Sequence, residues 1–188
     1  MAAKDIAVLN CLGGAGPEDE LIRCVAVSQH PTADLAVIET KGMVPDSFEK
    51  FKLSDRDYGL GTPVHCFGIL DEWMASQDSE RGHGRVIGGI IQRDLLWRDG
   101  PFVSMALEYS APIPKGMSGG PAFYARQPDT VLGMAIGTIT SSIVVSEYRD
   151  YKNDQTHEIE KISEITRYGV ILRLFPYQKR LQDNIPSR

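Results

Sequence analysis

The most informative stretch of the chain covers residues 110–121, which read SAPIPKGMSGGP. A serine that attacks a carbonyl carbon must stand on a tight turn, beside backbone N–H groups that stabilise the oxyanion. Gly116 suits such a turn because a side chain would obstruct the backbone angles that it needs. Gly119 and Gly120 leave room around Ser118 for a substrate and for other catalytic groups. The alternative is a glycine-rich turn with an incidental serine, which the clustering of three glycines and a proline disfavours.

The rest of the chain is typical of an all-β protein. Short segments rich in Val, Ile, Phe and Tyr alternate with Gly, Pro, Asp and Ser, a pattern that predicts strands joined by turns. Few of the connections are long enough for a crossover helix, so an antiparallel barrel or sandwich is favoured over a parallel sheet. The expected strands cover residues 5–10, 21–28, 34–40, 63–70, 85–91, 102–109, 122–125, 131–138 and 169–175.

Two further segments carry local signals. Residues 176–182 follow the last expected strand, and Pro176 suits the first turn of a short C-terminal helix. Residues 147–156 are polar and hold several charges, which predicts a solvated and mobile loop.

Composition limits the functional classes. The 188 residues contain 20 Lys and Arg against 25 Asp and Glu, for a net charge of −5. Without a long basic run we expect no nucleic-acid partner, and no apolar run approaches the ~18–20 residues of a membrane span. No Cys/His cluster suggests a metal site, and we expect neither a metal nor another cofactor. We expect the three cysteines to be free thiols in a reducing compartment, which favours the cytoplasm.

The hexapeptide at residues 116–121 resembles the GxSGGP motif of trypsin-like serine peptidases, which have the chymotrypsin fold. Residues 30–38, HPTADLAVI, resemble that family's HPxxDLAVL segment, whose aspartate is the triad acid. The resemblance implies a serine-type endopeptidase with Ser118 as nucleophile, Asp34 as acid and a polypeptide as substrate. Because Asp34 precedes an apolar strand, we expect its carboxylate to be partly buried against an N–H donor such as an imidazole.

The resemblance also implies the architecture. It predicts two antiparallel β-barrels and a short C-terminal helix, with residues 1–55 as the remainder of the first barrel and residues 56–188 as the second. The backbone N–H groups of Gly116 and Ser118 would form the oxyanion hole. Ile136, Gly137 and Thr138 would pair with the substrate backbone as an added strand.

The histidine base of the triad is missing from its expected place. In the family it precedes the aspartate by a few tens of residues, but no histidine precedes His30 here. His30 lies too close to Asp34, His65 belongs to an apolar strand, and His83 and His157 belong to loops. We therefore expect the first barrel to be incomplete, with its opening strands and the base histidine upstream of residue 1.

The sequence is compatible with two functions other than that of a peptidase. One is a catalytically inactive relative that keeps the cleft as a peptide-binding module. The other is an α/β-hydrolase-type esterase, because residues 116–120 also satisfy GxSxG, with Asp150 or Asp154 and then His157 following in that family's order. That elbow requires a helix directly after Ser118, where the sequence predicts a strand instead.

Overall fold

Nearly all regular structure in the chain is β-sheet. The computed structural model describes residues 7–8, 22–41, 51–69, 84–153 and 156–179. Within these ranges it contains ten strands and one short 3₁₀ turn near the C-terminal end. The predicted antiparallel all-β fold is confirmed.

The N-terminal strands form a small antiparallel sheet in the order β1-β2-β3. The strands are β1 (Ala7–Val8), β2 (Ile22–Gln29) and β3 (Ala36–Lys41). They match the expected strands at residues 21–28 and 34–40 to within two positions. The strand expected at residues 5–10 is described only at residues 7–8.

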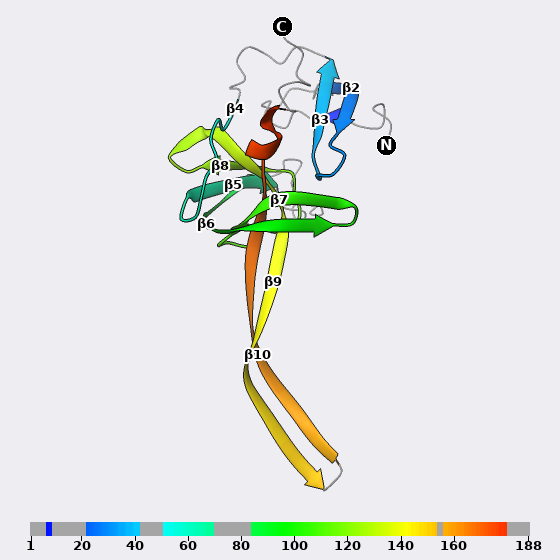
Figure 1. Ribbon diagram of the computed structural model, residues 1–188, viewed down its shortest axis with the longest axis vertical. Helices are drawn as coiled ribbons and strands as arrows, with labels where there is room; N and C mark the ends of the chain where they lie inside the picture. Colours follow the sequence, from blue (N-terminus) through cyan, green and yellow to red (C-terminus); the bar gives the residue numbers. More distant parts are fainter. Residues whose placement is uncertain (1–6, 9–21, 42–50, 70–83, 154–155, 180–188) are drawn as a thin grey trace, which may run out of the picture.

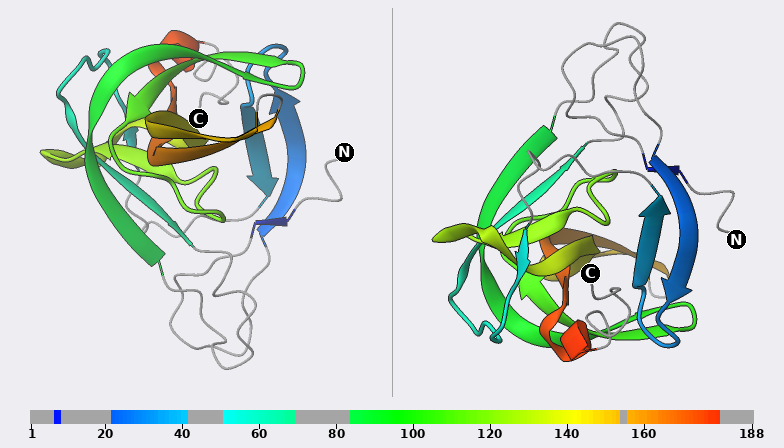
Figure 2. Two further views of the ribbon diagram at one scale, coloured as in Figure 1. Left: turned by 90° about the horizontal axis from the view of Figure 1, so that it is seen from below. Right: turned by 90° about the horizontal axis from the view of Figure 1, so that it is seen from above.

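Six further strands close into a ring (Figures 1 and 2). They pair in the order β10-β7-β6-β5-β8-β9, and β9 also pairs with β10, so the ring has no open edge where it closes. A short strand, β4 (Lys52–Leu53), adds parallel to the outside of β9. The six strands are β5 (Pro63–Ile69), β6 (Gly84–Asp99), β7 (Phe102–Tyr109), β8 (Pro121–Tyr124), β9 (Gln127–Asn153) and β10 (Thr156–Arg173).

The interior of the ring is apolar. Alternate residues of β5, Val64 and Cys66, are fully buried there together with Tyr109 of β7, as the two-residue period of a strand requires. The Tyr109 hydroxyl donates to the carbonyl oxygen of Ile87 at 2.7 Å, so burial leaves it paired. Cys66 is a free thiol, as expected, and burial raises its pKa to about 12.

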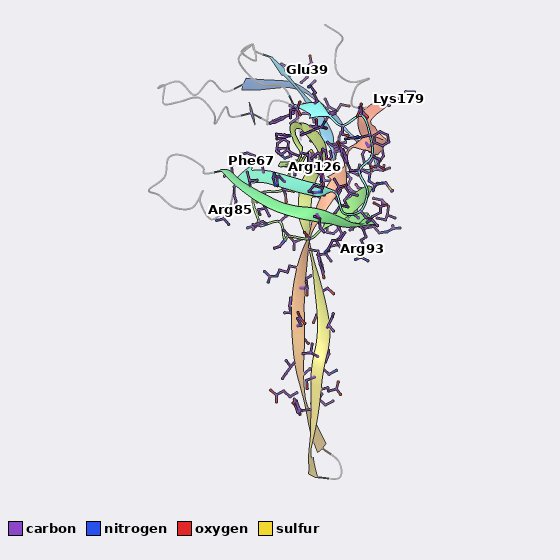
Figure 3. The ribbon with its side chains drawn as sticks, turned by 90° about the vertical axis from the view of Figure 1, so that its left-hand side faces the viewer. Glu39, Phe67, Arg85, Arg93, Arg126 and Lys179 are labelled. Carbon is purple, nitrogen blue, oxygen red and sulfur yellow. The ribbon has the colours of Figure 1, made fainter. Side chains whose placement is uncertain are left out.

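β9 and β10 continue far beyond the ring as a two-stranded ribbon, which we define as residues 139–153 and 156–168 (Figure 1). The prediction of a mobile loop at residues 147–156 is therefore wrong: β9 runs to Asn153, and β10 begins at Thr156. Side chains extend into solvent from both sides of the ribbon (Figure 3). The polar residues of the ribbon are compatible with this exposure to solvent. Lys161 of β10 forms an ion pair with Glu147 of β9 at 3.3 Å.

The small sheet and the ring share a second apolar cluster. Ala33 and Leu35, in the turn before β3, pack against Val131 of β9 and Leu172 of β10. The N–H group of Val103 donates to Thr32 in the same turn at 2.7 Å. This contact places the segment that carries Asp34 against the ring.

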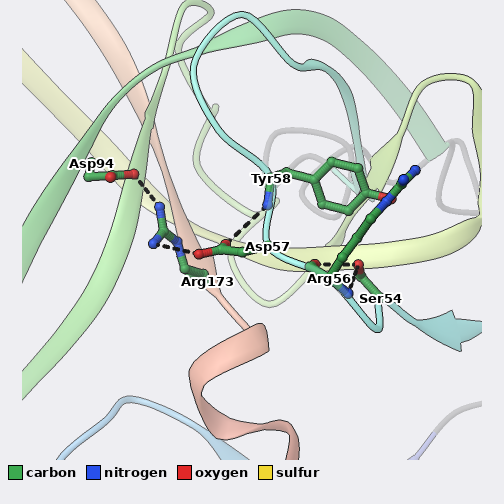
Figure 4. A network of polar contacts seen from close by, with 6 residues as sticks. All are labelled: Ser54, Arg56, Asp57, Tyr58, Asp94 and Arg173. Atoms are coloured by element: carbon green, nitrogen blue, oxygen red, sulfur yellow. Dashed lines mark hydrogen bonds and ion pairs between the residues drawn. The ribbon is translucent and has the colours of Figure 1, made fainter.

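The C-terminal end of β10 is fixed by two features. Arg173 is almost buried and pairs with Asp94 of β6 and, at 3.1 Å, with Asp57 in the loop after β4 (Figure 4). A 3₁₀ turn at Phe175–Tyr177 follows, and helical geometry continues to Lys179. The helix predicted at residues 176–182 therefore starts where expected, and its remainder lies outside the described residues.

Candidate active site

Ser118 stands on a double turn between β7 and β8. Its framework glycines have positive φ angles, +95° at Gly116 and +87° at Gly119, which residues with a side chain rarely adopt. Backbone bonds from Met117 to Pro114 (3.2 Å) and from Gly120 to Met117 (3.0 Å) close the two turns. The Met117 side chain is fully buried while Ser118 is exposed, so the turn anchors itself with one side chain and presents the next.

The turn is attached to β9 by two reciprocal backbone bonds. The Gly119 N–H donates to the Ala135 carbonyl, and the Ala135 N–H donates to the Gly120 carbonyl, both at 2.8 Å. On its other side the turn lies against β5, where a Cβ at Gly120 would overlap the carbonyl oxygen of Phe67. Gly120 therefore serves the close approach of two backbone segments, whereas the sequence suggested room for a substrate.

The predicted oxyanion hole keeps its donors available. Within the described residues, the N–H groups of Gly116 and Ser118 make no hydrogen bond. The Ser118 hydroxyl makes one long contact, to the carbonyl oxygen of Ile136 at 3.5 Å. An exposed hydroxyl beside two unused N–H groups is the arrangement that acyl transfer needs.

The segment predicted to bind substrate lies beside this serine. Ile136, Gly137 and Thr138 are half-buried, and Ile136 is an extra residue in β9, because Gly137 pairs with Val170 while Ala135 pairs with Ile171. β8 pairs with β9 only as far as Met134, so beyond Ala135 this edge of β9 has no partner strand among the described residues. The edge can therefore accept an extended peptide.

Thr138 has a second role that the sequence did not reveal. Its hydroxyl donates to the Ile113 carbonyl at 2.8 Å and accepts from the Ile113 N–H at 3.0 Å. Ile113 is buried and belongs to the segment that leads into the serine turn. The side chain of Thr138 thus holds that segment on β9, while its backbone remains part of the predicted binding edge.

Asp34 differs from expectation in one respect. It lies between Ala33 and Leu35, both buried, but its own side chain is exposed, so the predicted partial burial is wrong. The turn before β3 packs Ala33 and Leu35 into the apolar cluster and leaves the Asp34 side chain between them directed to solvent. Its carboxylate makes no hydrogen bond within the described residues. The apolar cluster under Asp34 includes Ile136, the residue that Ser118 contacts, and so links the two predicted catalytic residues.

His30 is held in the turn before β3 by hydrogen bonds to its ring. The Nδ1 atom of His30 accepts hydrogen bonds from the N–H groups of Ala33 at 3.0 Å and Thr32 at 3.3 Å. A triad histidine uses that atom as a donor to its aspartate, so His30 caps the turn instead.

The other histidines lie on β5 and on the ribbon, or outside the described residues. His65 is exposed on β5, between two buried residues. His157 pairs with Tyr151 at the far end of the ribbon rather than in a loop, and His83 lies outside the described residues.

Comparison with known proteins identifies the fold. No family model matches the chain, and neither does any curated protein. Among solved structures, the active form of the Rv3671c protease from M. tuberculosis aligns at a TM-score of 0.56 and 15% identity, over 90% of this chain and 62% of that one. The MamO protease domain from Magnetospirillum magneticum aligns at a TM-score of 0.56 and 18% identity, over 87% of this chain and 70% of that one. The fold is that of a trypsin-like protease domain.

The structural likeness covers only part of the Rv3671c protease. The chain spans less than two thirds of the length of the Rv3671c protease. The fold rules out the esterase alternative, because a nucleophile elbow needs a helix after the serine and strand β8 stands there instead.

The described ranges contain no helix long and apolar enough to span a membrane, and no group of three metal-binding side chains. Two surface hollows lie around residues 56–58, and neither is lined by Ser118 or Asp34.

Proposed function

We propose that this chain carries the nucleophile, the oxyanion hole and the acid of a serine-type endopeptidase acting on polypeptides. The observation that carries the proposal is the position of Ser118. It is exposed on a hydrogen-bonded double turn, beside two N–H groups and a strand edge that, over the described residues, have no hydrogen-bond partner. Its histidine base is supplied from outside this sequence. We also propose a cytoplasmic location and the division into residues 1–55 and 56–188.

In this mechanism the substrate pairs with Ile136, Gly137 and Thr138, which brings its scissile carbonyl to Ser118. The Ser118 oxygen attacks the carbonyl carbon while a histidine accepts its proton and later delivers it to the leaving amine. The N–H groups of Gly116 and Ser118 stabilise the oxyanion. Asp34, exposed and without a hydrogen bond to another described residue, accepts the Nδ1–H of that histidine and orients the ring.

A peptide-binding module without catalysis is the second candidate. It is favoured by His30, since the Nδ1 atom of that ring accepts two backbone N–H groups of the turn. The strand edge beside Ser118 would bind peptides whether or not a base is present.

A peptidase assay with added imidazole separates the two candidates. Loss of the histidine from a serine triad costs on the order of 10⁶ in turnover, so the chain alone should not cleave a fluorogenic peptide library measurably. Imidazole, as a replacement base, should produce cleavage that the Ser118→Ala variant lacks. Binding of peptides without cleavage at any imidazole concentration would favour the binding module. Strong cleavage without imidazole would show that one of the chain's own histidines is the base.

A further inference from the structure

The two outer edges of the ribbon differ in charge. Residues 139–146 of β9 contain no charged residue, whereas the paired residues 162–168 of β10 include Glu164 and Arg167. Proteins protect exposed strand edges from unwanted pairing with charged side chains, bulges or a covering segment. Over this stretch β10 has charged side chains and β9 does not, which indicates that the β9 edge is suited to pairing.

Register shifts define the length of this uncharged edge of β9. Pairing between β9 and β10 is regular from Gly137 to Val144, and it shifts immediately before and after that segment. Bulges interrupt the ladder and commonly occur beside active sites. Between them lies an uninterrupted edge on which Ile143 is 61% and Val144 50% exposed.

The free edge also begins at the candidate active site. Ile136, whose carbonyl contacts the Ser118 hydroxyl, directly precedes Gly137. β9 runs outward from this point along the ribbon (Figure 1). A polypeptide that pairs antiparallel to β9 therefore runs inward and brings its C-terminal end to Ser118. The part of a substrate that precedes the scissile bond would lie along the ribbon.

We propose that residues 137–144 are an extended substrate subsite, which binds the segment preceding the scissile bond as an added β-strand. The inference rests on the proposed function and names its substrate class: polypeptides with an uncharged, strand-forming segment before the cleavage point. Ile139, Ser141 and Ile143 share one face of the ribbon, which we call the isoleucine face, and Thr140, Ser142 and Val144 share the other. Apolar substrate residues at alternate positions would pack on the isoleucine face, with polar residues opposite them.

A shortened ribbon provides the test. Ile139 and Tyr168 are paired, so an Asn-Gly turn can join them in place of residues 140–167. All pairings of the ring remain, because β9 meets β8 before residue 135 and β10 meets β7 from Gly169 onward. Thermal unfolding of this variant checks that the ring is intact.

The probes are fluorescein-labelled peptide boronic acids, which can bond to the Ser118 oxygen when added imidazole accepts the hydroxyl proton. One is a tripeptide that reaches only Ile136–Thr138, and the other is a decapeptide of alternating threonine and valine with N-terminal lysines for solubility. We expect the decapeptide to bind the full chain at least about tenfold more tightly than the tripeptide, with no such gain on the shortened chain. Equal affinities on the full chain, or the same gain on both chains, would overturn the subsite.

Two N-methylated decapeptides test the mode of binding. Because N–H groups of a strand point alternately to its two edges, methylation of one alternate set should abolish the length gain, and methylation of the other should preserve it. Equal effects of the two sets would overturn strand addition. A dimer of the unliganded chain that dissociates when the ribbon is shortened, without a peptide length effect, would assign the edge to a second copy instead. Failure of the tripeptide to bind either chain would contradict the proposed function itself.

Discussion

Replacement of Thr138 by valine tests how β9 holds the segment before the serine turn. Valine keeps the shape of threonine and removes the hydroxyl that bonds to both backbone groups of Ile113, at 2.8 and 3.0 Å. Ile113 is only 5% exposed, so its N–H and carbonyl groups would be left largely without a partner. A lost hydrogen bond costs about 1 kcal/mol, and an unpaired buried group costs about 1–3 kcal/mol. Thr138→Val should therefore lower the free energy of unfolding by about 2–4 kcal/mol.

The assay is urea unfolding monitored by circular dichroism, with Thr138→Ser as the matched control. Serine keeps the hydroxyl and loses one methyl group, which should cost about 1 kcal/mol or less. Valine favours strands at least as well as threonine does, so propensity cannot explain a loss. A valine variant as stable as the serine variant would refute the assigned role of this hydroxyl.

Two further predictions concern packing and burial. Gly120→Ala should destabilise the chain by several kcal/mol and reduce peptide binding, because the alanine Cβ would overlap the carbonyl oxygen of Phe67. Gly59→Ala, where a Cβ meets open space, is the control. Equal thermal stabilities of the two variants would contradict the close approach assigned to Gly120. Burial raises the pKa of Cys66 from 9.0 to about 12, so the stability that it contributes is complete below pH 9 and is lost as the pH rises toward 12. Relative to Cys66→Val, the parent chain should lose about 3 kcal/mol between pH 8 and 11 in urea titrations, and parallel pH profiles would contradict this.

Local sequence patterns predicted the strands and the serine turn well. The positive φ angles of Gly116 and Gly119 are a backbone property that glycine signals directly, and the ring strands follow two-residue alternation. The ribbon beyond residue 138 is not predictable in this way, because polar stretches such as residues 147–156 are typical of loops as well as of exposed strands. A two-stranded ribbon exposes both faces to water, so its charged residues are compatible with regular pairing.

Contacts between distant segments could not be predicted from local patterns. The exposure of Asp34 depends on Ala33 and Leu35 both packing against the ring, and the pairing of Thr138 with Ile113 joins segments that no local motif connects. The buried Arg173 likewise pairs with Asp57 and Asp94, which come from two other parts of the chain. Such contacts follow from the closure of the ring.

The most direct test of the account is the reaction of the chain with a fluorophosphonate probe, followed by mapping of the modified serine by mass spectrometry. The free N–H groups of Gly116 and Ser118 should favour phosphonylation at Ser118, with imidazole present as base. We predict that Ser118 is labelled faster than every other serine, and that this preference disappears in Gly116→Ala and in urea-unfolded protein. Labelling spread evenly over the serines, or an unchanged preference for Ser118 after unfolding, would contradict the claim that the fold makes Ser118 a nucleophile.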